Sequence, residues 1–127
     1  MANPISPELA TGTVGELLVQ LRLLQYRVQA APPLKDSGND LIALKGFAIR
    51  CVQVKTTTNG LPAWPPENKK YHILAIVRLA GQDKELRLDD STVYLLRKEE
   101  LNGLAHSWKG IENFKLDEGR VQDLFRE

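Results

Sequence analysis

Asp40, Gln53 and Lys55 are polar residues set into two runs of β-branched and aliphatic residues, within the stretch "SGNDLIALKGFAIRCVQVKTTTNG". Because side chains alternate along a strand, Gln53 and Lys55 share one face of the second run. Carboxylate and amide oxygens suit a hard cation such as Mg²⁺, which also takes substrate phosphate as a ligand. A lysine beside that cation can orient a bound water or neutralise charge on phosphorus. These residue types indicate metal-assisted phosphoryl chemistry if a hairpin brings them together.

The turn of this hairpin decides where Asp40 points. A turn at Lys45-Gly46, with Leu44 opposite Phe47, places Asp40 opposite Cys51 and diagonal to Gln53, roughly 7 Å away on the same face. A four-residue turn keeps the same parity. A three-residue turn sends Asp40 to the other face, with Arg50 and Val52.

A helix must precede the hairpin. Ser6-Pro7-Glu8 is typical of a helix start, and we expect a helix over Leu9–Tyr26. One broad apolar face is predicted for it, which leaves Glu16 on a second stripe with Leu9, Val19 and Leu23. The residues of the broad face are Ala10, Val14, Leu17, Leu18, Leu21 and Leu24. Gly12 and Gly15 indicate close approach of another backbone.

The rest of the chain predicts a mixed sheet. Strands are expected at Tyr26–Ala31, Asp40–Leu44, Phe47–Lys55, Tyr71–Leu79 and Thr92–Leu96. A long loop is expected at Thr56–Lys70, an exposed excursion at "AGQDKELRLDDS", a short helix ending near Gly103, and a closing helix at about 117–126. This order predicts an α/β fold, with a mixed central β-sheet flanked by helices in one domain, residues 1–127, whose core spans about 8–97.

Composition narrows the function further. A net charge of +1, with 26% charged and 43% hydrophobic residues, excludes a polybasic coat and an acidic disordered tail. The single cysteine, Cys51, excludes an internal disulfide and a multi-cysteine metal site, and it favours the reducing cytoplasm. We expect neither secretion nor a membrane span. His72 and His106 show no ligand spacing and are expected to be ordinary polar residues.

Asp40, the hairpin and Gln53-Val54-Lys55, with Glu16 on the preceding helix, resemble the PD-(D/E)XK nuclease superfamily of restriction enzymes, Holliday junction resolvases and some homing endonucleases. The resemblance covers roughly 12–77 and implies a restriction endonuclease-like core of αβββαβ type. It implies that Asp40, Gln53 and the Val54 carbonyl hold Mg²⁺, or Mn²⁺ in its place, with help from Glu16. Lys55 would then serve the hydrolytic water. DNA would be the substrate, and a homodimer the expected assembly.

Two departures from the family pattern stand out. Asn39 replaces the name-giving proline, and Gln53 replaces the second acid, which removes one negative charge from the metal site. The sequence therefore leaves three functions open: an active nuclease, a catalytically reduced relative that binds nucleic acid or a protein partner, and a plain interaction domain.

Other residues have alternatives too. Lys35, Lys45, Lys69 and Lys70, together with Arg50, are candidates for a rim that attracts DNA phosphates, or for ordinary solvated cations. Asp40 is also suited to capping its loop through hydrogen bonds to backbone amides. Lys55 is also suited to reaching solvent from the end of its strand, and Glu16 to lying on the surface of its helix. Trp64 is suited to stacking on a base or, with more weight, to covering the core.

Overall fold

The computed structural model describes residues 4–35, 39–67 and 70–127. In chain order the elements are α1 (Pro7–Gln25), β1 (Gln29–Ala31), β2 (Leu41–Lys45), β3 (Ala48–Thr57), β4 (Ile73–Ala80), the 3-10 turn η1 (Asp83–Glu85), β5 (Arg87–Arg97), α2 (Lys98–Gly103), the 3-10 turn η2 (Ile111–Phe114) and α3 (Glu118–Leu124). None of the helices in these ranges is long and apolar enough to cross a membrane.

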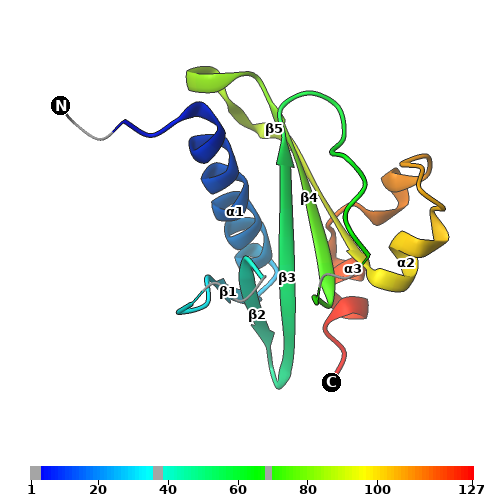
Figure 1. Ribbon diagram of the computed structural model, residues 1–127. Helices are drawn as coiled ribbons and strands as arrows, with labels where there is room; N and C mark the ends of the chain where they lie inside the picture. The colour runs from blue at the N-terminus through cyan, green and yellow to red at the C-terminus, as the bar shows by residue number, and fades with distance from the viewer. Residues whose placement is uncertain (1–3, 36–38, 68–69) are drawn as a thin grey trace.

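The five strands form one mixed sheet in the order β1-β2-β3-β4-β5 (Figure 1). Neighbouring strands are antiparallel except β3 and β4, which are parallel. The predicted α/β fold, with a mixed sheet flanked by helices, is confirmed. The connection between β3 and β4, where an αβββαβ order places a helix, is a loop in its described residues.

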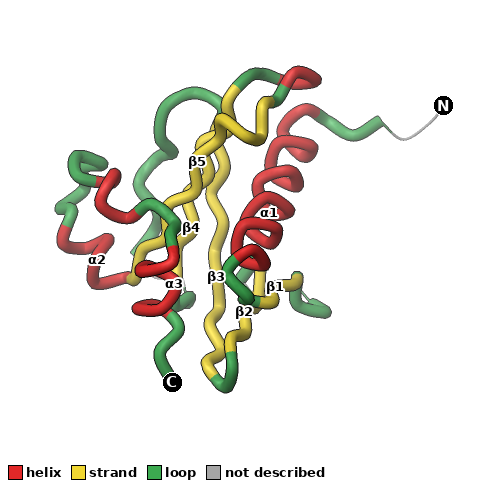
Figure 2. The backbone as a smooth tube through the Cα atoms, turned by 180° about the vertical axis from the view of Figure 1, so that it is seen from behind, coloured by secondary structure: helices red, strands yellow, loops and turns green. Residues whose placement is uncertain are grey.

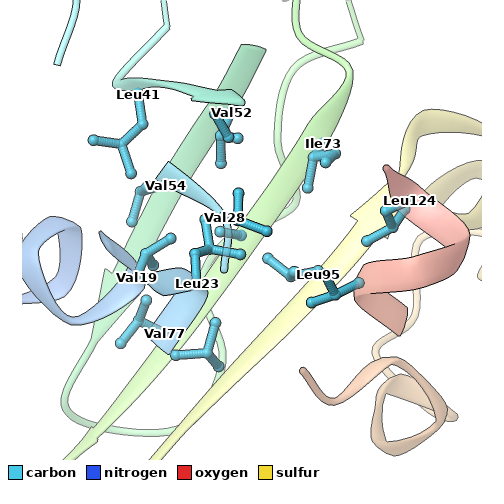
Figure 3. Close-up of a cluster of buried hydrophobic side chains, with 14 of the residues drawn as sticks. Val19, Leu23, Val28, Leu41, Val52, Val54, Ile73, Val77, Leu95 and Leu124 are labelled. Carbon is cyan, nitrogen blue, oxygen red and sulfur yellow. The ribbon is translucent and has the colours of Figure 1, made fainter. Parts of the chain in front are cut away.

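The sheet is covered on both faces. On one face, residues of α1 and α3 pack against alternate residues of the strands, as Val19, Leu23 and Leu124 show in Figure 3. On the other face, a second cluster joins Leu74 and Tyr94 of the sheet to α2, η2 and the loop after β3. Seen from behind, α1 runs along the β1–β3 side of the sheet, whereas α2 and α3 lie on the β4–β5 side (Figure 2).

The predicted packing face of α1 is wrong. The helix starts as expected, because the Ser6 hydroxyl accepts a hydrogen bond from the Leu9 amide. However, the residues that α1 buries are Gly15, Leu18, Val19 and Leu23, and of the predicted apolar face only Leu18 is buried. Leu17, Leu21 and Leu24 stay 57%, 56% and 55% exposed. The stripe beside Glu16 faces the sheet instead.

Gly15 explains this choice of face. A Cβ at Gly15 would lie 2.7 Å from Cγ2 and 2.8 Å from Cβ of Thr56, distances that real Cβ atoms essentially never show. The missing side chain therefore lets α1 approach β3 through the Gly15 stripe. Close approach was predicted for both glycines, but Gly12 has no neighbouring atom within 4 Å of the position of a Cβ.

Other strand boundaries differ from prediction too. β1 starts only at Gln29, because Tyr26 still caps α1 and Arg27 adopts a left-handed conformation, φ 67°. β3 extends to Thr57, so the long loop begins later than expected. β5 begins at Arg87, so the charged segment predicted as an exposed excursion is partly strand. The first four residues of β5 are exposed, so their polar side chains gave no sign of a strand in the sequence.

Candidate functional site

The hairpin of β2 and β3 turns one residue later than predicted. Lys45 pairs with Ala48, so the turn is Gly46-Phe47, with Gly46 at φ 61°. The turn still has an even number of residues, so the predicted parity is kept. Cys51 pairs with Ile42, and continuing the ladder places Asp40 beside Gln53.

Asp40 is joined directly to both parts of the Gln53-Val54 segment. Its Oδ2 accepts a hydrogen bond from Gln53 Nε2 at 2.8 Å and another from the Val54 amide at 2.8 Å. The Asp40 amide donates to the Val52 carbonyl at 3.0 Å, which fixes the backbone of Asp40 at the end of β2. These contacts cross to β3, so Asp40 does more than cap its own loop, of which residues 36–38 lie outside the described residues.

The backbone of Val54 adds an oxygen at the same place. The N–H and C=O of one strand residue point to the same edge, so the Val54 carbonyl lies at the edge where its amide meets Asp40. β2 begins only at Leu41, which pairs with Val52. The Val54 carbonyl therefore lies beyond the end of the β2–β3 ladder.

The Gln53 amide is the unusual group of this site. The residue is buried, with 9% of its surface exposed, and its Nε2 is bonded to Asp40. Among the described residues, its Oε1 has no hydrogen-bond partner. A buried acceptor without a partner costs about 1–3 kcal/mol. Gln53 thus carries an oxygen suited to a ligand, directly beside the Asp40 carboxylate.

An open cavity of about 680 Å³ brings the predicted residues together. Glu16 lines it from α1, Asp40 from the start of β2, and Gln53, Val54 and Lys55 from β3. Glu16 and Asp40 also border a smaller adjoining hollow of about 210 Å³. The packing of Gly15 against Thr56 sets this arrangement, because each of these two residues is adjacent in sequence to a cavity residue, Glu16 or Lys55.

Sequence reasoning missed part of the cavity wall. Thr57, Thr58 and Asn59 continue the wall beyond Lys55, and Gln82 and Asp83 close it from the β4–β5 connection. The run of threonines after Lys55 was a signal that was available in the sequence. Gln82 and Asp83 gave none, since only the parallel pairing of β3 and β4 brings that connection to the cavity.

Among the described residues, none of the lysines predicted to attract phosphate lines the cavity. Lys35 and Lys70 are exposed, and Lys45 is half-buried at the hairpin turn. Lys69 lies outside the described residues. Lys55 is the lysine that reaches the cavity.

His72 and Arg50 have structural roles. His72 Nδ1 accepts a hydrogen bond from the Cys51 amide at 2.8 Å and extends the pairing of β3 with β4. Arg50 donates to the carbonyls of Leu124 and Arg126, so it ties β3 to the end of α3 and to the residues after it.

Among the described residues, several groups with a shifted pKa lie away from the cavity, around α2, α3 and β5. Burial works to raise the pKa of Glu100, but hydrogen bonds from Arg120 and from the Arg97 backbone outweigh it and lower that pKa. Hydrogen bonding to Arg97 lowers the pKa of Asp123. Burial raises the pKa of Tyr94, whose hydroxyl donates to Glu112. Their hydrogen bonds join β5 and α2 to η2 and α3, away from the cavity.

Within the described ranges, no three His, Cys, Asp or Glu side chains gather as a group that could hold a metal ion. A cation here would need a mixed set of ligands. Asp40, Glu16, the Gln53 amide and the Val54 carbonyl form such a set, and Mg²⁺ commonly binds through only one or two carboxylates.

Comparison with known proteins adds a single likeness. No protein-family model and no curated protein matches this chain. The solved structure of a bacterial homing endonuclease has a TM-score of 0.42 and 15% sequence identity, and the match covers 73% of this chain and 71% of that one. A likeness of this size does not establish a function, which we infer from the contacts of this chain.

Proposed function

We propose that this protein is a Mg²⁺-dependent endonuclease that hydrolyses phosphodiester bonds in DNA. The observation that carries the proposal is the Gln53 amide, whose Nε2 donates to the Asp40 carboxylate and whose buried Oε1 has no hydrogen-bond partner among the described residues. It lies at the wall of an open cavity that Lys55 also lines. A buried amide that serves only structure would be expected to satisfy both of its ends.

The donor set fits a magnesium ion. Asp40 would supply the anionic ligand, and the Val54 carbonyl lies at the same strand edge. Turning the Gln53 amide about its last bond would present Oε1 to the cation and relieve its unpaired state. Glu8, Glu16 and Asp83 also line the cavity, and of these Glu16 would compensate for the missing acid at position 53.

The chain's own residues then perform three tasks. When bound, the cation lowers the pKa of a water and stabilises negative charge on the phosphate. Asp40, Glu16 and Lys55 all line the cavity, so it holds both negative and positive charge. Lys55 would orient the attacking water and offset the charge that builds on the phosphoryl oxygens. Thr57 and Thr58 offer hydroxyls that could contact a phosphate.

Cleavage of supercoiled plasmid in Mg²⁺ or Mn²⁺ tests the proposal. Wild-type protein should nick or linearise the plasmid, and Lys55→Ala and Asp40→Asn should each lower the rate by at least about a hundredfold. Lys45→Ala is the matched control, because it removes a lysine from the far end of the same hairpin, and its rate should stay within a few-fold of wild type. An inactive wild type, or equal activity of Lys55→Ala, contradicts the proposal.

One observation favours a second function. Gln53 Nε2 and the Val54 amide already satisfy Asp40 Oδ2 without a cation, as expected of a catalytically reduced relative that only binds DNA or a protein partner. That alternative predicts DNA retention in a gel shift with no cleavage, and equal retention in Mg²⁺ and in EDTA.

Homodimerisation belongs to the proposal as well. Leu17, Leu21 and Leu24 have the four-then-three spacing of helix pairs and lie exposed along α1. A second copy presenting the same stripe would cover them, and it would set two cavities against two DNA strands. Sedimentation velocity should show a dimer that Leu21→Lys dissociates and that Leu34→Lys, at another exposed leucine, leaves intact. A monomeric wild type would refute this part.

A further inference from the structure

A second cavity, of about 380 Å³, lies between the loop that precedes β4 and helix α2. Trp64, Pro66, Tyr71 and Leu101 give it an apolar wall, and Asn102 and His106 stand among its polar lining. Its volume falls within the roughly 300–1,000 Å³ of sites for small organic ligands. None of these residues lines the cavity at Asp40.

A flat heterocycle already stacks in this region. The His106 imidazole lies on the Trp64 indole, with ring centroids 5.1 Å apart and planes 26° apart. Trp108 packs on Trp64 at 4.5 Å, and its Nε1 donates to the Pro62 carbonyl at 2.9 Å, which anchors the aromatic group. The Trp64 face therefore accepts a planar polar ring.

His106 is held on Trp64 weakly and with strain. Ala105 and His106 both adopt left-handed backbone conformations, φ 54° and 61°, which disfavour residues other than glycine. The side chain is 68% exposed, and its ion-pair partner Glu67, at 3.8 Å, is 81% exposed. Such an exposed pair contributes little. A ring with a larger π surface could displace the imidazole and release the strain.

We infer that this cavity binds an unstacked nucleobase, which takes the place of the His106 imidazole on Trp64. The Asn102 amide offers one donor and one acceptor, the pair that base edges recognise. The Lys98 ammonium, 4.8 Å from the centre of the Tyr71 ring, supplies positive charge for the attached phosphate. The inference rests on the proposed action on DNA, and it adds capture of an extruded or single-stranded base at a place separate from hydrolysis.

Tryptophan fluorescence tests this directly, because both tryptophans of the chain belong to this cluster. Titration is done in EDTA, where no Mg²⁺-dependent cleavage occurs. A single-stranded oligonucleotide should quench the fluorescence, whereas an abasic phosphodiester of equal length should not. Equal quenching by both would overturn the inference, since only the backbone would then be bound.

Two glycine variants sharpen the test. His106→Gly removes the competing ring and the strain, so it should bind the oligonucleotide about tenfold tighter. Ala105→Gly is the matched control: it relieves strain but leaves the imidazole on Trp64, so it should not bind tighter. Asn102→Ala should weaken binding by about tenfold. Unchanged affinity of His106→Gly would argue against a nucleobase site.

The result is separable from the nuclease proposal. Base-dependent quenching by a protein that cleaves no plasmid would keep the base site and remove the enzymatic function. Cleavage without base-dependent quenching would do the reverse.

Discussion

Replacing Gln53 by glutamate restores the acid expected in an Mg²⁺ site and tests the role of the amide. Nε2 now donates to Asp40 at 2.8 Å, so Gln53→Glu places two carboxylates in contact. The variant loses a charge-assisted hydrogen bond, about 1.5–3 kcal/mol, and gains a repulsion of about 1–4 kcal/mol. Because Gln53 is buried, we expect a destabilisation near the middle of the combined range, about 3–6 kcal/mol, in the absence of metal.

Magnesium should reverse much of this loss. A cation between the two carboxylates removes their repulsion, and binding at a hundredfold excess over Kd adds about 2.7 kcal/mol. Acid should also help, because one proton shared by the two carboxylates removes their repulsion. The destabilisation is then largest at neutral pH and shrinks as the pH falls through the range where one proton enters the pair.

Urea unfolding in EDTA and in Mg²⁺, at several pH values, measures these effects. Gln53→Met is the control, because it removes the hydrogen bond without adding charge, and Mg²⁺ should stabilise it less than it stabilises Gln53→Glu. The reasoning is refuted if Gln53→Glu is as stable as wild type in EDTA, or if Mg²⁺ stabilises it no more than it stabilises Gln53→Met.

Two further predictions concern the framework. Gly15→Ala should destabilise the folded protein by about 1–3 kcal/mol and lower the cleavage rate, because the new Cβ meets Thr56 and pushes α1 away from β3. Gly12→Ala, where a Cβ has open space, should stabilise the folded protein by about 0.5–1 kcal/mol. Thermal unfolding measures both variants, and equal effects would contradict the packing of α1 through Gly15. Glu100→Gln should cost about 1.5–3 kcal/mol at pH 7. The lowered pKa of Glu100 makes its contribution complete above its ordinary pKa of 4.5 and lost as the pH falls through the lowered value, so the gap from wild type should close in acid; a constant gap would contradict it.

The sequence predicted the hairpin residues of the site because their relation is local. Any even turn unites Asp40 with Gln53, so an error of one residue in the turn did no harm. The packing face of α1 was not predictable from its leucines, since the helix carries two apolar stripes. Only the contact of Gly15 with Thr56, set by the tertiary fold, selects between them.

Long-range contacts could not be predicted from the sequence, because they too are set by the tertiary fold. Nothing near Asp83 indicates that the β4–β5 connection reaches the cavity. The ion pair of Arg120 with Glu100 joins α3 to α2 across the end of β5. The sequence around neither residue indicates this pairing. β5 was predicted too short, because its first half is polar and exposed at the surface of the sheet.

The parallel junction between β3 and β4 has a consequence for the order of assembly. Hairpins close within about 1–10 μs, and Asp40 meets Gln53 across only 13 positions of chain. β4 can pair with β3 only after the whole loop between them closes, and α1 brings Glu16 to the cavity by docking onto β3. The cost of closing that loop rises only slowly with its length. Insertions there could therefore vary from one relative to another, while a hairpin that forms early keeps Asp40, Gln53 and Lys55 together.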